Sequence, residues 1–121
     1  MAYNAPFQPV GNTVSLQTSG TASTSQSRQV TIANFGVDYA RPNIRVVNRG
    51  SADIWISITE ATATIAIPTP GTTTAGTPQQ CWVIVPGIVE VFTIPAGPTF
   101  WVSDISTGIS QVYHIIMGEG S

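Results

Sequence analysis

The residues of this chain that can do chemistry are few and scattered. His114 is the only histidine and Cys81 is the only cysteine. A metal site or a catalytic triad needs companions for the histidine, and none is at hand, so we expect His114 to be buried or half-buried with a hydrogen-bond partner. Cys81 opens an apolar strand and has no neighbouring histidine or arginine to lower its pKa. This context is typical of a small core residue.

The carboxylates form no recognisable catalytic pair either. A glycosidase needs two of them held roughly 5 to 10 Å apart across a cleft, and a pair such as Glu90 with Asp104 is the alternative that remains open. Glu90 is a lone charge in an apolar stretch, where it either faces solvent or meets an arginine across an interface. We predict no catalytic residues, no metal site and no cofactor. The full set is Asp38, Asp53, Glu60, Glu90, Asp104 and Glu119.

Composition narrows the class of protein further. Charged residues are only 8% of the 121 residues, against a usual share of roughly a quarter. The net charge is −2, and all four basic residues are arginines. A nucleic-acid binder needs clustered Lys and Arg, so we expect no nucleic-acid partner. The start of the chain does not resemble a signal peptide and no apolar run is long enough for a membrane helix, so we expect synthesis in the cytosol and no membrane partner.

The elements that must position these residues are predicted to be strands. The densest apolar run extends from Cys81 to Val102, and Pro86-Gly87 and the segment 95–98 divide it. Proline presets φ for the second position of a turn and glycine tolerates positive φ at the third. β-branched and aromatic residues fill the pieces between the turns, which favours strands over helices. The expected strands are 12–18, 29–33, 41–49, 52–59, 81–85, 88–94, 99–103 and 111–117, with 65–67 as a short edge strand.

This pattern predicts an all-β protein, a single β-sandwich of about eight strands with jelly-roll or immunoglobulin-like topology. We expect an extended arm over residues 1–11, the sandwich over 12–117 and a flexible tail over 118–121. The loop 60–79 is rich in Pro, Gly and Thr, and loops of that length are typically functional or disordered. We interpret it as a loop that contacts a partner.

Strands 41–49 and 52–59 are predicted to form a hairpin with a three-residue loop. Ile44 and Val46 then join the core, together with the isoleucines of the second strand. The outer face would carry Arg45 near Trp55 and Arg49 near Asp53, where cation–π stacking contributes roughly 0.5–1 kcal/mol. We predict a contact surface there. The full set of predicted interface residues is Phe7, Arg41, Arg45, Arg49, Trp55 and Trp101.

A second hairpin, 81–85 with 88–92, is apolar on both faces. One face of a sandwich sheet is normally polar, so we expect this hairpin to be covered on both sides. We expect another subunit to be the cover, with a loop as the alternative. Trp55 and Trp101 are predicted to face outward, with Phe100 and Val102 facing inward. The tryptophans indicate either core or protein-interface packing, which we favour, or an aromatic platform for sugar rings.

Several stretches of the chain resemble small structural proteins of tailed bacteriophages. The similarity is carried by VEVFTIPAG and the aromatic strand after it, by STGISQVYHIIMGEG near the C-terminus, by FQPVGNTVSL near the N-terminus and by RVVNRGSADIWI. These are turn and strand patterns rather than catalytic signatures. Proteins of this family are β-rich and decorate, or cement, the phage head.

The resemblance implies a non-enzymatic virion protein on the capsid surface, made in the host cytoplasm. Its expected partners are the major capsid protein and further copies of itself, as a trimer or dimer, and its expected effect is to stabilise the capsid. The alternative is a tail, fibre or host-surface β-sandwich that binds glycan through exposed tryptophans.

Overall fold

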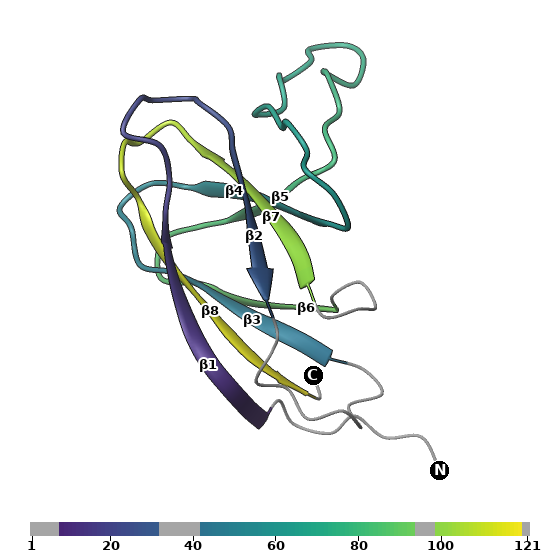
Figure 1. The fold of residues 1–121 in the computed structure, drawn as a ribbon. Helices are drawn as coiled ribbons and strands as arrows, with labels where there is room; N and C mark the ends of the chain where they lie inside the picture. The colour runs from purple at the N-terminus through teal and green to yellow at the C-terminus, as the bar shows by residue number, and fades with distance from the viewer. Residues whose placement is uncertain (1–7, 32–41, 94–98, 120–121) are drawn as a thin grey trace.

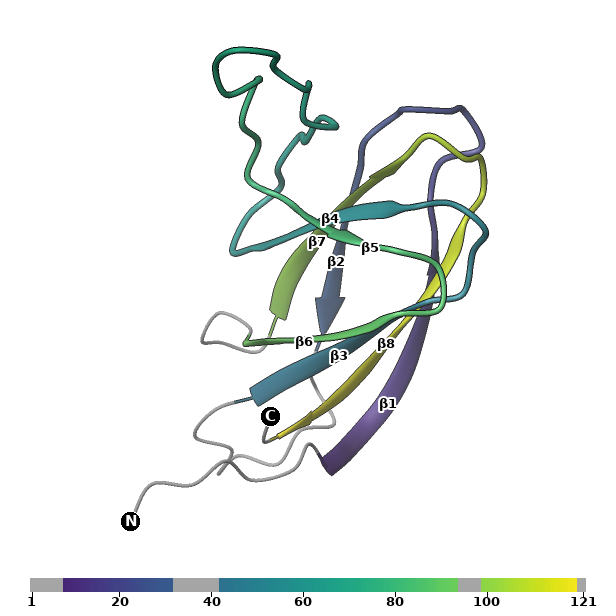
Figure 2. The ribbon, with the colours of Figure 1, turned by 180° about the vertical axis from the view of Figure 1, so that it is seen from behind.

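The computed structural model describes residues 8–31, 42–93 and 99–119 and shows eight strands in two four-stranded sheets, packed face to face (Figures 1 and 2). Sheet A has the order β1-β8-β3-β6 and sheet B has the order β2-β7-β4-β5, and all neighbouring strands are antiparallel. The predicted all-β sandwich is therefore confirmed. The strands are β1 (Gln8–Gln17), β2 (Gln26–Thr31), β3 (Pro42–Asn48), β4 (Ile54–Thr59), β5 (Trp82–Ile84), β6 (Val89–Thr93), β7 (Thr99–Ser106) and β8 (Val112–Glu119).

The strand order distinguishes between the two topologies that the sequence allows. In an immunoglobulin fold the first two strands are neighbours in one sheet, whereas β1 and β2 lie in different sheets here. The antiparallel pairs include β1 with β8, β2 with β7, β3 with β6 and β4 with β5. Such nested pairing over two sheets is the arrangement of an eight-stranded jelly roll.

The core forms from the inward-facing rows of the strands, as the alternation predicts. Ile44 and Val46 of β3 and Ile54 and Ile56 of β4 are all buried in the same cluster. Phe100 is fully buried as well, and its neighbour on the outer row, Trp101, is only half-buried. The rest of the cluster comprises Val30, Ile84, Val102, Tyr113, Ile115 and Met117, with Val14, Leu16, Ile58 and Phe92 at its margins.

The first predicted hairpin, 41–49 with 52–59, is wrong. β3 belongs to sheet A and β4 to sheet B, so the short connection crosses from one sheet to the other. Asn48 holds this corner: its buried amide donates from Nδ2 to the carbonyls of Ala52 (3.0 Å) and Ile84 (2.6 Å), and its Oδ1 accepts from the Gly50 N–H (2.8 Å). The Asn48 side chain thus forms hydrogen bonds with backbone N–H and C=O groups that, in a hairpin, would be paired with the neighbouring strand.

The second predicted hairpin is wrong for the same reason, although its turn is correct. Gly87 has φ of +79° and the Ile88 N–H bonds the Val85 carbonyl at 3.1 Å, as expected when Pro-Gly occupies the centre of a turn. The turn nevertheless leads from β5 in sheet B to β6 in sheet A. Both strands therefore lie at a sheet edge instead of pairing with each other.

The limits of the sandwich also differ from the prediction at both ends. β1 begins at Gln8, which pairs with Glu119, so part of the predicted arm and part of the predicted tail form a ladder. The predicted edge strand over 65–67 does not form. Ile65 instead packs against the outside of sheet B, where its N–H bonds Ser25 Oγ at 3.1 Å.

A buried carboxylate joins the two sheets. Asp104 of β7 faces inward, is fully buried and forms an ion pair with Arg28 of β2 in the same sheet. Tyr113 of β8, in the opposite sheet, donates its hydroxyl to Asp104 Oδ2 at 2.5 Å. Arg28 Nη1 also donates to the Gln17 carbonyl at the end of β1 (2.8 Å). The group therefore connects strands of both sheets, and Asp104 does not face a cleft where it could pair with Glu90.

Burial is the largest influence on the pKa values of Asp104 and Tyr113. It raises the pKa of the Asp104 carboxyl, and the Tyr113 hydrogen bond and the Arg28 charge oppose that rise only in part. Burial, followed by the charge of Asp104, also raises the pKa of Tyr113 well above its ordinary value. Removing a carboxylate from water disfavours its charged form, and Asp104 Oδ1 has no hydrogen-bond partner within the described residues.

Asp104→Asn tests the direction of this shift. A raised pKa in the folded state means that folding favours the protonated acid, so the contribution of Asp104 to the free energy of unfolding is greatest below about pH 4 and falls as pH rises through the raised pKa. Urea unfolding of both proteins from about pH 3 to about pH 8 measures this. The free energy of wild type minus that of the variant should fall with rising pH. A difference that rises over the same range would mean that Arg28 dominates and that the pKa is lowered.

Candidate interaction surfaces

The predicted interface residues do not lie on one surface. Arg45 and Arg49 lie on sheet A and on the connection that follows β3, whereas Trp55 and Trp101 lie on the outer row of sheet B. The predicted proximity of Arg45 to Trp55 and of Arg49 to Asp53 is therefore wrong, because it required β3 and β4 to pair. Phe7 and Arg41 are outside the described residues.

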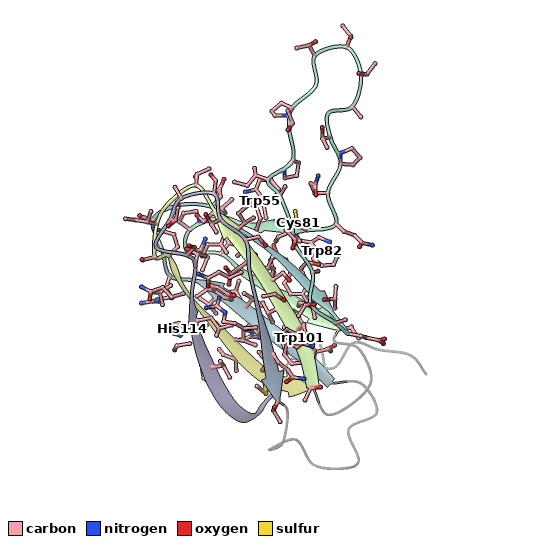
Figure 3. The ribbon with its side chains drawn as sticks, turned by 45° about the horizontal axis from the view of Figure 1, so that its top comes forward. Trp55, Cys81, Trp82, Trp101 and His114 are labelled. Atoms are coloured by element: carbon pink, nitrogen blue, oxygen red, sulfur yellow. The ribbon has the colours of Figure 1, made fainter. Side chains whose placement is uncertain are left out.

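The segment 60–67 covers much of the outer face of sheet B. Ser103 Oγ donates to the Ala63 carbonyl at 2.8 Å, and Ile65 is buried. Ser57, Ser103 and Ile105, which alternation places on this outer face, are buried as well. Trp55 and Trp101 are half-buried beside this cover, and Figure 3 shows Trp55 and Trp82 near the base of the long connection with Trp101 lower on the sandwich. The three indoles do not form one open platform.

The principal exposed apolar feature lies where β5 and β6 meet. Six of the seven large hydrophobic side chains that are exposed in the described residues fall between positions 82 and 91, with exposed fractions of 38% to 50%. We call these residues the apolar edge: Trp82, Val83, Val85, Ile88, Val89 and Val91. Exposed apolar patches on soluble proteins commonly mark interaction sites. The edge strands on the other side of the sandwich are polar by comparison, since Ser15, Gln17 and Gln29 are exposed there.

Aromatic contact organises the apolar edge. Trp82 of β5 and Phe92 of β6 lie with ring centroids 5.5 Å apart at an interplanar angle of 48°, within the range of favourable tilted aromatic pairs. The contact joins the two free edges across the open side of the sandwich. Glu90 lies between Trp82 and Phe92 in the sequence. Its side chain is exposed, although it is on the inner row of β6, opposite Val46. It is the single charged residue in the stretch 82–93.

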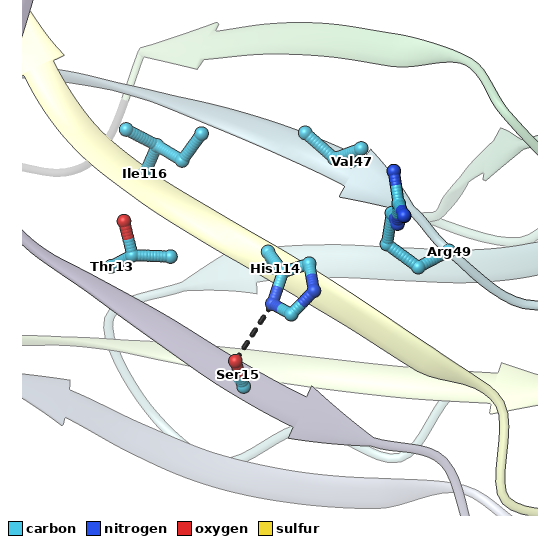
Figure 4. Close-up of a pocket in the computed structure, with 6 residues that line it drawn as sticks. All are labelled: Thr13, Ser15, Val47, Arg49, His114 and Ile116. Atoms are coloured by element: carbon cyan, nitrogen blue, oxygen red, sulfur yellow. Dashed lines mark hydrogen bonds between the residues drawn. The ribbon is translucent and has the colours of Figure 1, made fainter.

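A shallow hollow of about 460 Å³ lies on the outer face of sheet A (Figure 4). His114 and Ile116 of β8 lie between Thr13 and Ser15 of β1 on one side and β3 on the other. Ser15 Oγ and His114 Nδ1 are hydrogen-bonded at 2.7 Å, so the prediction of a half-buried histidine with a hydrogen-bond partner is confirmed. The remaining lining residues are Val47 and Arg49.

The chemistry of this hollow favours binding an anion. A nucleophilic triad adds an acid that orients the histidine, and no carboxylate lines the hollow. Arg49 supplies a guanidinium, and Thr13 and Ser15 supply hydroxyl groups. Sequence reasoning placed Arg49 on a partner surface but missed its proximity to His114, because that depends on the pairing of β3 with β8.

Cys81 is half-buried just before β5, and its Sγ lies 3.7 Å from the Ala66 carbonyl oxygen. Burial raises the pKa of this thiol, which disfavours the reactive thiolate. Among residues 8–31, 42–93 and 99–119, no group of three or more His, Cys, Asp or Glu side chains is placed to hold a metal ion.

The middle of the connection between β4 and β5, residues 69–77, stands away from both sheets (Figures 1 and 2). Its outer part closes on itself, since Thr69 and Thr77 form an antiparallel bridge and the Thr77 N–H bonds the Thr69 carbonyl at 3.1 Å. A Cβ on Gly76 would lie 1.4 Å from the Thr69 carbonyl oxygen, so glycine is required at this close approach. The tip at 70–75 is exposed throughout.

Comparison with protein-family models, curated proteins and solved structures finds no match to this chain. Within the part of the chain that the structure describes, no helix has the length and apolarity needed to cross a membrane.

Alanine substitution separates the apolar edge from the core. Trp82→Ala should lower the free energy of unfolding by about 1–2 kcal/mol, because the indole is half-exposed and loses mainly its contact with Phe92. Phe100→Ala should cost about 3–5 kcal/mol, because its ring is fully buried. Urea unfolding measures both. Equal losses would show that Trp82 belongs to the core.

Proposed function

We propose that this protein is a non-enzymatic structural protein of a bacteriophage virion that binds the outer surface of the capsid, as an oligomer, and stabilises the shell. The observation that carries the proposal is the apolar edge, where six large hydrophobic side chains are exposed along one side of the sandwich. A surface of this kind is costly to leave in water and is typical of a protein that works in an assembly.

The architecture is compatible with this role but does not distinguish it from others. Jelly rolls occur in viral capsid proteins and also in lectins and cupins, and a fold by itself does not establish function. The sequence resemblance to phage head proteins favours the capsid role. The glycan-binding alternative relies on a platform of exposed tryptophans, but Trp55 and Trp101 are half-buried. Trp82, which is 50% exposed and packs on Phe92, is left without a second exposed indole beside it.

The proposed mechanism is mass action. A protein that binds the assembled shell and not its separated subunits lowers the free energy of the shell, and so opposes its rupture. Each bound copy adds its own binding free energy to the cost of opening the shell. The stabilisation therefore requires no catalysis and no cofactor.

Co-sedimentation with candidate phage heads through a density gradient tests the proposal. Wild type should travel with the heads at a fixed stoichiometry, and heads lacking it should rupture at a lower temperature. The double variant Val85→Asp/Ile88→Asp, which places charges on the exposed turn of the apolar edge, should lower binding at least about tenfold, because burying unpaired carboxylates is unfavourable.

Ile109→Asp is the matched control. Ile109 is 58% exposed but lies in the connection between β7 and β8, outside the apolar edge, so this variant should bind like wild type. Wild type that stays at the top of the gradient with every candidate head would contradict the capsid role. A saturable change in tryptophan fluorescence on titration with glycans would then favour the alternative.

The projecting connection is proposed as a contact with the shell, in addition to the apolar edge as an assembly surface. Replacing residues 70–76 with Asn-Gly should leave the sandwich intact, since a two-residue turn can join the bridged Thr69 and Thr77. Head binding should fall at least about tenfold while the midpoint of thermal unfolding changes by no more than about 4 °C. Unchanged binding by the shortened protein would exclude the connection as a contact.

A further inference from the structure

The apolar edge carries one charge that any partner must accommodate. Glu90 is exposed within it and forms no ion pair or hydrogen bond with the described residues. Glu90 shares the inner row of β6 with Phe92, which packs on the exposed Trp82. A partner that covers Trp82 at the open side of the sandwich would therefore also remove this carboxylate from water. An unpaired buried carboxylate is strongly unfavourable, whereas one that meets a cation and hydrogen-bond donors is tolerated. The partner surface should therefore offer a cation among apolar side chains.

The chain itself contains, within its described residues, a surface that meets this requirement. All four of its basic residues are arginines. Arg28 is paired with Asp104, Arg45 already has an interaction, and Arg41 lies outside the described residues. Arg49 is exposed, and its guanidinium has no partner within the described part of the chain. Among the arginines that the structure describes, it is therefore the one available to a second molecule.

The hollow around Arg49 has the chemistry that a carboxylate needs. Val47 and Ile116 provide apolar walls, and the polar lining groups are Thr13, Ser15 and His114 (Figure 4). The hydrogen bond between Ser15 Oγ and His114 Nδ1 holds the imidazole in place. A guanidinium beside fixed hydrogen-bonding groups is a favourable site for a carboxylate.

Glu90 cannot reach this hollow within its own chain. It lies on the inner row of β6, beside Val46, while Val47, His114 and Ile116 lie on the outer row of the same sheet. The two rows point to opposite faces. Two apolar edges that met each other directly would bring two Glu90 carboxylates together without a cation, which is unfavourable.

We propose that the apolar edge of one copy packs on the outer face of sheet A of a second copy, with Glu90 of the first seated in the hollow against Arg49 of the second. This inference rests on the proposed role of the edge as an assembly surface, and it names the occupant of that surface. The contact joins apolar area to apolar area and the unpaired carboxylate to the unpaired guanidinium. In this arrangement the projecting connection is not part of the contact between copies, and it is the part of the protein that we expect to bind the shell.

Sedimentation velocity of the purified protein, without phage heads, tests the contact. Wild type should associate at concentrations of about 10–100 μM. Glu90→Arg and Arg49→Glu should each weaken association at least about tenfold, because each places like charges together. The double variant Glu90→Arg/Arg49→Glu should restore the wild-type dissociation constant to within about threefold, because the pair is re-formed with the charges exchanged.

Glu60→Arg is the matched control, since Glu60 is an exposed carboxylate just beyond β4 and outside the apolar edge. It makes the same change of charge and should associate like wild type. Wild type that remains monomeric, single variants that associate normally, or a double variant that is not restored would each overturn the inference. A monomer that still co-sediments with heads would overturn this contact alone, whereas an oligomer that binds no head would overturn the proposed function alone.

Discussion

The nested pairing of strands is the constraint on which the surfaces of this protein depend. Because β1 pairs with β8, β2 with β7, β3 with β6 and β4 with β5, the chain must cross between sheets at almost every connection. Two of these crossings are set locally, one by the buried amide of Asn48 and the other by the Pro86-Gly87 turn. The second crossing leaves β5 and β6 as free edges beside each other, and this is why their apolar residues reach solvent instead of a hairpin partner.

The interior of the sandwich contains few ionisable side chains. Within the described part of the chain, the carboxylate of Asp104 is buried between the sheets and is matched by Arg28 and Tyr113. An arrangement of this kind contributes little net stability compared with apolar packing, but it destabilises any alternative in which the carboxylate loses its partners. The same reasoning applies at the open side of the sandwich, where Glu90 is exposed and has no ion pair with the described residues. Because the chain has no lysine, an ion pair between Glu90 and another copy calls for an arginine of that copy, and each arginine that already has an interaction is less able to form it.

The outer faces of the two sheets differ in how much of their surface the chain itself covers, and this difference bears on function. Sheet B is covered by the chain itself, through the segment 60–67 that buries Ile65 and Ser103. Sheet A presents a hollow with a guanidinium, an imidazole and apolar walls. The surfaces proposed for assembly are therefore the apolar edge, the outer face of sheet A and the projecting connection. None of them depends on a catalytic group, and all are consistent with a structural role in a larger particle.

The sequence by itself determined the class of fold, the direction of most side chains and the positions of the main turns, because alternation and Pro-Gly chemistry act over a few residues. It correctly turned Ile44, Val46 and Phe100 inward and Trp101 outward. Only the tertiary structure decided which strands pair, since a turn fixes a change of direction but not the sheet that the next strand joins. That decision separated Arg45 from Trp55, brought Arg49 beside His114, and enclosed Asp104 with Arg28 and Tyr113. Arg49 with His114 and Arg28 with Asp104 are contacts between strands distant in sequence, and even Asp104 and Tyr113, nine residues apart, meet only because their strands lie in opposite sheets. Local patterns carry no information about such contacts.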